Sequence, residues 1–316
     1  MLIKLNRDYP KRVQASGIVM CKKIVLHAMT KKGYEVATLL FEKYREIVDF
    51  LVIGKDKNIK DDYSENLRQL AINYGVQYYY HNDTYTIPQE SYVLAVSWRW
   101  MIRSIEDSKL IVFHDSILPR YRGFAPLVNS LINGEHEIGV TALFGSDEYD
   151  KGDIIAQATS FIDYPIKLSD AIEVNNLNYI KLADLIFNSL HSGREIKSSQ
   201  QDESLATYSI WRDESDYEID WNQSSTYIKR FIDSVGYPYS GAITNVDENK
   251  VVVLDAEVVQ DVVCEHRHVG KVIFVENGCP VVICGKGLLK ITKAVVKEEN
   301  QARDFLPINK FRMKFY

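Results

Sequence analysis

The sequence predicts an α/β fold in which a doubly wound parallel sheet is followed by a smaller β-rich domain. Over the first half of the chain, short apolar runs alternate with segments of helical spacing. Over the last third, short β-type runs are separated by Gly and Asn turns. The length of 316 residues, with 46% apolar and 26% charged residues, suits a globular chain of two unequal domains.

The first domain, residues 21–195, is expected to be Rossmann-like. Buried parallel strands take the form of short continuous apolar runs, and ligands bind beyond their carboxyl ends. Ser97 and His114 end two such runs, so chemistry is expected there. The expected strands are residues 23–27, 47–53, 76–80, 92–97 and 110–114, and the expected helices are residues 34–44, 65–74 and 168–190.

The second domain, residues 207–316, is expected to be a small barrel or sandwich. Residues 196–206 lie in a polar, Ser- and Gln-rich stretch typical of a linker, and residues 1–20 are expected to form a disordered extension. One helix is predicted at residues 224–235. The predicted strands are residues 241–246, 250–259, 271–275, 281–284 and 288–294.

Composition excludes several classes of protein. No run of eighteen apolar residues exists to span a membrane, and the net charge of −5 disfavours nucleic-acid binding through phosphate contacts. Four cysteines and the lack of a signal-peptide core favour a cytoplasmic protein. The CEHRH segment, with Cys279 and Cys284 downstream, fits no common zinc spacing, so no metal is expected.

Residues 112–157 are the most informative stretch. They place His114 at a strand end, a turn containing Pro119 next, and Asp150 in a later turn before Gly152. A histidine and an aspartate brought into one cleft can manage a proton and a developing oxyanion during acyl transfer to an amine. Taken alone, two such residues far apart in sequence are more often unrelated surface or capping groups.

The whole pattern is more specific than the pair. HDSILPRYRGFAP, GVTALF and YDKGDII resemble the signature of the 10-formyltetrahydrofolate-dependent formyltransferases. DYEIDW, IKRFIDSVGYPYSGA, GKVIF and VVICGKGLLKI resemble the open-barrel, OB-like domain appended in that family. The resemblance spans roughly residues 22–296 and implies N-formyl transfer with 10-formyltetrahydrofolate as the formyl donor.

The resemblance also implies roles for individual residues. His114 would stabilise charge on the formyl oxygen, and Asp150 would tune that histidine and take the amine proton. The implied folate-binding residues are Ser97, Trp98, Arg99, Trp100, Met101, Leu118, Asp147, Glu148 and Tyr149.

One position departs from the family. The family's catalytic asparagine lies two residues before the histidine, where this chain has Val112, which cannot donate a hydrogen bond. Losing one oxyanion donor costs on the order of 100- to 1000-fold in rate. Either Ser97, Arg99 or Asn129 substitutes, or activity is weak or absent.

Two family branches carry a similar second domain, and they differ in the amine that accepts the formyl group. Residues 207–316 hold 14 Lys/Arg and 16 Asp/Glu, and residues 54–67 form a short segment of mixed charge. Both features favour a nucleotide-linked amino sugar over tRNA. Methionyl-tRNA formyltransferase, and a folate- or sugar-nucleotide-binding homologue without catalysis, remain the alternatives.

For a nucleotide sugar, cations are needed for the diphosphate and an aromatic face for the base. The acceptor would be a 3-amino- or 4-amino-dideoxy hexose on UDP or dTDP, used for bacterial surface glycans, and the family likeness implies a homodimer. For the two aromatic residues, core packing is the alternative role. The candidate substrate-binding residues are Arg120, Tyr121, Arg122, Gly123, Tyr208 and Trp211.

Overall fold

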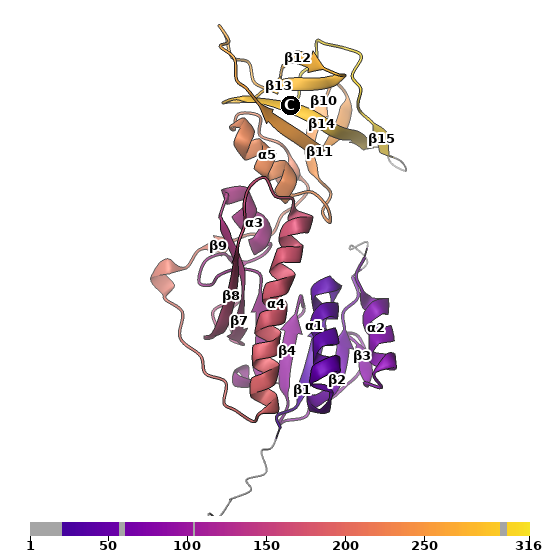
Figure 1. Ribbon diagram of the computed structural model, residues 1–316, viewed down its shortest axis with the longest axis vertical. Coiled ribbons are helices and arrows are strands. Elements are labelled where there is room, and N and C mark those ends of the chain that lie inside the picture. The colour runs from indigo at the N-terminus through magenta and orange to yellow at the C-terminus, as the bar shows by residue number, and fades with distance from the viewer. Residues whose placement is uncertain (1–20, 57–60, 104, 298–301) are drawn as a thin grey trace, which may run out of the picture.

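A computed structural model describes residues 21–56, 61–103, 105–297 and 302–316 (Figure 1). The predicted extension at residues 1–20, and residues 57–60 of the mixed-charge segment, lie outside the described residues. The α/β class of the first part and the β-rich character of the second are both confirmed. Among the described residues, no helix is long and apolar enough to cross a membrane.

The first part is built on a seven-stranded sheet whose strand order is β3-β2-β1-β4-β5-β7-β8. The first five strands run parallel, but β7 and β8 pair antiparallel, so the sheet is mixed instead of wholly parallel. Residues 145–153, which join β7 to β8, are too few for the crossover that a parallel pair needs. The strands are β1 (Ile24–Ala28), β2 (Val48–Ile53), β3 (Tyr78–Tyr80), β4 (Tyr92–Val96), β5 (Leu110–His114), β7 (Glu137–Phe144) and β8 (Ile154–Phe161).

Helices α1 (Thr30–Lys43), α2 (Ser64–Asn73) and α4 (Leu168–His191) cover one face of this sheet (Figure 1). Their apolar sides bury the main core with alternate strand residues such as Leu26 and Leu51. The described part of the other face carries no α-helix, unlike a doubly wound sheet. There, loop residues such as Tyr85 and Ile87 pack on Val25 and its neighbours.

The second part is a six-stranded antiparallel sheet with one helix, α5 (Ser225–Ser234), packed on β11. The α5 helix begins where the Ser224 hydroxyl accepts a hydrogen bond from the Tyr227 amide at 3.2 Å, as N-cap serines do. The strands are β10 (Ala242–Val246), β11 (Asn249–Val259), β12 (Val272–Glu276), β13 (Cys279–Ile283), β14 (Leu288–Lys297) and β15 (Ala302–Asp304); β15 was not predicted.

Helix α3 (Pro126–Asn133) joins the two parts. It lies between β5 and β7 in the chain, yet its apolar residues belong to the core of the second part. Leu127, Leu131 and Ile132 pack in one cluster with Ile228 and Phe231 of α5. The two parts therefore share a core at α3.

The segment predicted as a linker is bound to the first part. The main chain of Ser199 pairs with Ile154 of β8 through two hydrogen bonds of 2.8 and 2.9 Å. Further on, β9 (Tyr208–Ser209) pairs in parallel with β6 (Arg122–Gly123). Gly123 has φ 99°, and a Cβ there would collide with the Ser209 carbonyl oxygen, so this close pairing requires glycine.

Candidate functional site

The structure brings His114 and Asp150 together although 36 positions separate them. His114 is the last residue of β5, and its Nδ1 lies 3.4 Å from Oδ1 of Asp150. Its Nε2 lies 2.8 Å from the main-chain carbonyl oxygen of Tyr121. Both ring nitrogens thus face oxygen acceptors, so an imidazolium can donate to both. The histidine is buried, with 7% of its surface exposed, which shields these interactions from water.

Asp150 is held in an unusual backbone conformation. Its φ is 58°, in the left-handed region that non-glycine residues seldom adopt. Its second carboxylate oxygen accepts a hydrogen bond from the Gly123 amide at 2.8 Å. The Nε2 of Gln201 donates to the carbonyl oxygens of Asp150 (2.7 Å) and Gly152 (2.8 Å). The turn that presents the carboxylate to His114 is therefore fixed on both its side chain and its main chain.

Arg122 occupies a structural position, contrary to its predicted role as a phosphate-binding cation. Its side chain is fully buried. Nη1 and Nη2 bind the two carboxylate oxygens of Glu203 at 2.9 and 2.6 Å, and Nε and Nη2 bind Oε1 of Gln201 at 3.1 and 2.7 Å. The guanidinium already forms a bidentate pair with the Glu203 carboxylate. It therefore anchors residues 201–203 instead of binding a ligand.

Arg120 is half-exposed and is also paired. Its guanidinium forms an ion pair with Glu135, whose pKa it holds below the usual value. The Tyr121 hydroxyl donates to the same carboxylate at 2.7 Å and accepts from Asn133 at 3.0 Å. Binding of an anionic ligand by Arg120 would have to compete with Glu135.

The predicted aromatic face is exposed. Tyr208 and Trp211 present 65% and 62% of their surface to solvent, so core packing, the alternative role, is wrong for both. Phe124, directly after Gly123, is exposed to a similar extent. A group of aromatic rings therefore lines the surface next to the turn that binds Asp150.

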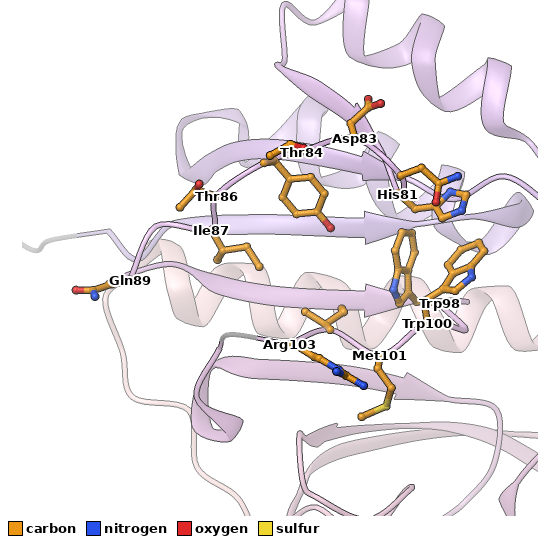
Figure 2. Close-up of a pocket in the computed structure, with 13 residues that line it drawn as sticks. His81, Asp83, Thr84, Thr86, Ile87, Gln89, Trp98, Trp100, Met101 and Arg103 are labelled. Carbon is orange, nitrogen blue, oxygen red and sulfur yellow. The ribbon is translucent and has the colours of Figure 1, made fainter.

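The segment after β4 forms one wall of a cavity of about 720 Å³ (Figure 2). Trp98, Trp100 and Met101, three of the predicted folate-binding residues, line it. Trp100 stacks on His81, with ring centroids 4.1 Å apart. The opposite wall is the loop 81–89, which sequence reasoning missed because the loop matches no motif.

Several buried polar atoms around this cavity have no partner. The indole Nε1 of Trp98, Nδ1 of His81 and Nδ1 of His27 are all buried without a hydrogen-bond partner among the described residues. His27 is fully buried, its Nε2 lies 3.0 Å from the Tyr85 hydroxyl, and burial lowers its pKa to about 3. Unpaired polar atoms beside a cavity are typical of a site that binds a polar ligand.

Other predicted folate-binding residues lie at the edges of this region. Ser97 directly follows β4 and has φ 52°, and Leu118 is buried in the turn before β6. Arg99 forms an ion pair with Asp56. Residues 147–149 form the exposed loop before Asp150, in which Glu148 pairs with Lys151 at 2.5 Å.

Val112 lies within β5, in register with Ala95 and Leu143. Of the groups predicted to replace the family asparagine, Asn129 uses its amide nitrogen on the Ala125 carbonyl at 3.0 Å, and Arg99 is paired as described above. Ser97 is the remaining candidate.

Asp115, next to His114, is part of a separate buried pair. Burial alone would raise its pKa, but the ammonium group of Lys32, together with Tyr179 and His114, holds the pKa below its usual value. Nδ2 of Asn175 donates to the same carboxylate at 3.3 Å. Among the described residues, no group of three or more His, Cys, Asp or Glu side chains is arranged to hold a metal ion.

Fold and site together define a two-part α/β protein that carries an acid–base pair at the carboxyl edge of its sheet. Residues 101–172 match the family model described as Formyl transferase, and residues 212–309 match the one described as Formyl transferase, C-terminal domain. The chain therefore belongs to the formyl transferase family of enzymes.

Among curated proteins, the methionyl-tRNA formyltransferase of Fusobacterium nucleatum is 29% identical over 196 residues, 61% of each chain. That of Clostridium novyi is 32% identical over 184 residues, 57% of each chain. The similarity thus spans about three fifths of the length of these relatives.

Solved structures share the fold over more of the chain. WlaRD, a sugar 3N-formyl transferase solved in the presence of dTDP and 5-N-formyl-THF, has a TM-score of 0.64 at 18% identity, over 89% of this chain and 99% of its own. An N-formyltransferase from Helicobacter canadensis, in complex with folinic acid and dTDP-3-aminofucose, has a TM-score of 0.64 at 15% identity, over 90% and 100%. HypX from Aquifex aeolicus, in complex with tetrahydrofolic acid, has a TM-score of 0.57 at 17% identity, over 90% of this chain and 46% of its own.

Proposed function

We propose that this protein is an N-formyltransferase that moves a formyl group from 10-formyltetrahydrofolate to the amine of a nucleotide-linked amino sugar. The observation that carries the proposal is the His114–Asp150 pair, 3.4 Å apart, in a chain matched by both formyl transferase family models. The finer choice of acceptor rests on further observations of charge and surface.

In this reaction the neutral amine attacks the formyl carbon. A new C–N bond forms, the bond from that carbon to N10 of the folate breaks, and the proton lost by the amine balances the one gained by N10. Asp150 accepts the amine proton, directly or through water, and His114 stabilises the charge that develops on the formyl oxygen. The fixed turn around Asp150 keeps the carboxylate ready for this transfer.

The donor is proposed to bind along residues 97–101 and the loop 147–149. The cavity beside Trp98 and Trp100 supports this, because its aromatic walls suit a flat heterocycle and its unpaired buried nitrogens suit polar ring atoms. Leu118 is proposed as an apolar contact beneath the formyl group. The pteridine would satisfy atoms such as Trp98 Nε1 that otherwise remain unpaired.

A UDP- or dTDP-linked amino-dideoxy hexose is proposed as the acceptor. The two structural neighbours solved with dTDP or dTDP-3-aminofucose match the fold over nearly their whole length. The exposed Tyr208, Trp211 and Phe124 near Asp150 suit stacking on a nucleobase. The product would enter bacterial surface glycans, and a cytoplasmic homodimer is the expected form.

The second candidate is formylation of methionyl-tRNA. It is favoured by the sequence comparison, because the curated relatives of 29–32% identity are methionyl-tRNA formyltransferases. Against it, residues 207–316 carry more acidic than basic side chains, 16 against 14, which disfavours a phosphate-rich macromolecule. A third candidate, a binding protein without catalysis, is raised by Val112.

One assay separates the three. The protein is given 10-formyltetrahydrofolate with dTDP- or UDP-linked 3-amino- or 4-amino-dideoxy hexoses, or with methionyl-tRNA, and release of tetrahydrofolate is followed. We expect release with an amino sugar. Release with tRNA alone would reject the proposed acceptor, and tight binding of sugar nucleotide and folate without release would reject catalysis.

A further inference from the structure

Among the residues that the structure describes, one arginine beside the proposed acceptor site, Arg212, forms no ion pair with a carboxylate. Arg212 follows the exposed Trp211 and is half-buried. Its Nη2 donates to Oδ1 of Asn129 at 2.7 Å, and its Nη1 donates to the main-chain oxygen of Asp216 at 3.2 Å. Both acceptors are neutral. Its Nε is buried without a hydrogen-bond partner among the described residues.

Arg212 differs in this from the two arginines that the sequence favoured. Arg120 is paired with Glu135, and Arg122 with Glu203. A guanidinium has five N–H donors; Arg212 uses two of them in these hydrogen bonds and buries a third, on Nε, which leaves two Nη donors for a ligand. An unmatched, half-buried guanidinium with free donors suits an anion that presents several oxygens.

Arg212 lies near two tyrosines of the second part. It acts electrostatically on Tyr217 and Tyr239, whose ring centroids lie 6.3 Å apart and whose pKa values are raised chiefly by burial. The charges of Asp115 and Arg99 also act on Tyr239, which lies in the loop after α5.

Arg212 is also connected to the catalytic pair by a short path. Nδ2 of its partner Asn129 lies 3.4 Å from the main-chain carbonyl oxygen of Phe124. Phe124 follows Gly123, whose amide binds the Asp150 carboxylate. An anion held by Arg212 would thus lie near the segment whose Gly123 amide binds the Asp150 carboxylate, close to the exposed Trp211.

We propose that Arg212 binds the diphosphate of the nucleotide-sugar acceptor, in place of Arg120 and Arg122. The inference rests on the proposed function. The remaining Nη donors would bind phosphate oxygens, Trp211 or Tyr208 would stack on the base, and the sugar amine would extend toward Asp150. Sequence reasoning missed this residue because nothing in its immediate sequence distinguishes it from a solvated arginine.

The test measures binding of dTDP and of UDP to the full-length protein by calorimetry, together with KM values for acceptor and donor. Arg212→Met should weaken nucleoside diphosphate binding by about ten-fold or more, because a charge-assisted bidentate contact is lost. Arg212→Lys keeps the positive charge but lacks the planar guanidinium. Its nucleoside diphosphate affinity should lie between that of the wild type and that of Arg212→Met. Donor KM should stay at the wild-type value in both variants.

The matched control is Arg194→Met, which removes the same charge from an exposed position in the segment after α4. It should leave nucleotide affinity unchanged, which separates local binding from net charge. Wild-type nucleotide affinity in folded Arg212→Met would overturn the role of Arg212 and leave the proposed function standing. If the wild-type protein binds neither nucleotide, both proposals fail together.

Discussion

Replacing Gln201 by leucine tests whether the segment after α4 positions Asp150. Gln201 lies in the predicted linker, yet its amide bridges the carbonyl oxygens of Asp150 and Gly152 and the guanidinium of Arg122. Leucine is similar in size but forms none of these hydrogen bonds. The substitution therefore releases the left-handed turn at Asp150 while leaving both catalytic side chains in the protein.

The magnitude follows from the bonds that are lost. Two neutral hydrogen bonds are worth about 1 kcal/mol each, and the charged one to Arg122 about 1.5–3 kcal/mol. Because Gln201 is half-buried, water replaces part of this, and we expect the free energy of unfolding to fall by about 2–3 kcal/mol. A carboxylate displaced by about 1 Å costs on the order of 100-fold in rate, so kcat should fall about 10- to 100-fold.

The assay combines urea unfolding with formyl transfer at saturating donor and acceptor. Gln201→Glu is the second variant. Its carboxylate keeps an oxygen that accepts from Arg122, but it cannot donate to the carbonyl oxygens of Asp150 and Gly152 and is repelled by them, so kcat should also fall. Gln200→Leu, at the exposed neighbouring position, is the matched control and should leave both quantities unchanged. If Gln201→Leu loses stability but keeps the wild-type kcat, the positioning role is refuted.

Three further predictions concern the same region. His114→Asn and Asp150→Asn should each remove most turnover while leaving ligand binding intact, and a wild-type rate in either would exclude that residue from the mechanism. Trp98→Phe should raise donor KM about 5-fold, the value of one hydrogen bond, without changing acceptor KM; an unchanged donor KM would show that the indole N–H contacts no donor atom. Buried His27 has a pKa of about 3, so between pH 6.5 and 3 its imidazole takes up a proton in the unfolded chain but not in the folded one. As pH falls through this range, the free energy of unfolding of the wild type should therefore decrease by about 1.4 kcal/mol more per pH unit than that of His27→Leu. Equal pH slopes in urea unfolding would contradict this.

The sequence was sufficient to predict the elements whose signal is local. The apolar runs before Ser97 and His114 became β4 and β5, and the long helical segment became α4 (Figure 1). Strands β7 and β8 were not among the predicted strands, and their antiparallel pairing was missed because an apolar run carries no information on strand direction. The sheet face covered by loops was missed because helices were expected in every crossover.

The partners of charged groups were the least predictable part of the site. Arg122 lies in a motif that suggests ligand binding. Its guanidinium instead forms an ion pair with the carboxylate of Glu203, which is far away in the sequence. Gln201 and Arg212 matter through contacts with residues from other elements, Asp150 and Asn129. Local sequence patterns cannot reveal such contacts, because the contacts form only when the chain folds.

The placement of α3 has a consequence for how this chain folds. Sequence suggests a division near residue 195, but Leu127, Leu131 and Ile132 bury their side chains among residues that follow that point. A fragment ending there would expose this apolar face to water, and the remaining fragment would lack part of its interior. The two parts should therefore unfold as one cooperative unit. The segment directly before α3 contains Gly123, whose amide binds the Asp150 carboxylate, so the geometry around Asp150 depends on completion of the whole chain.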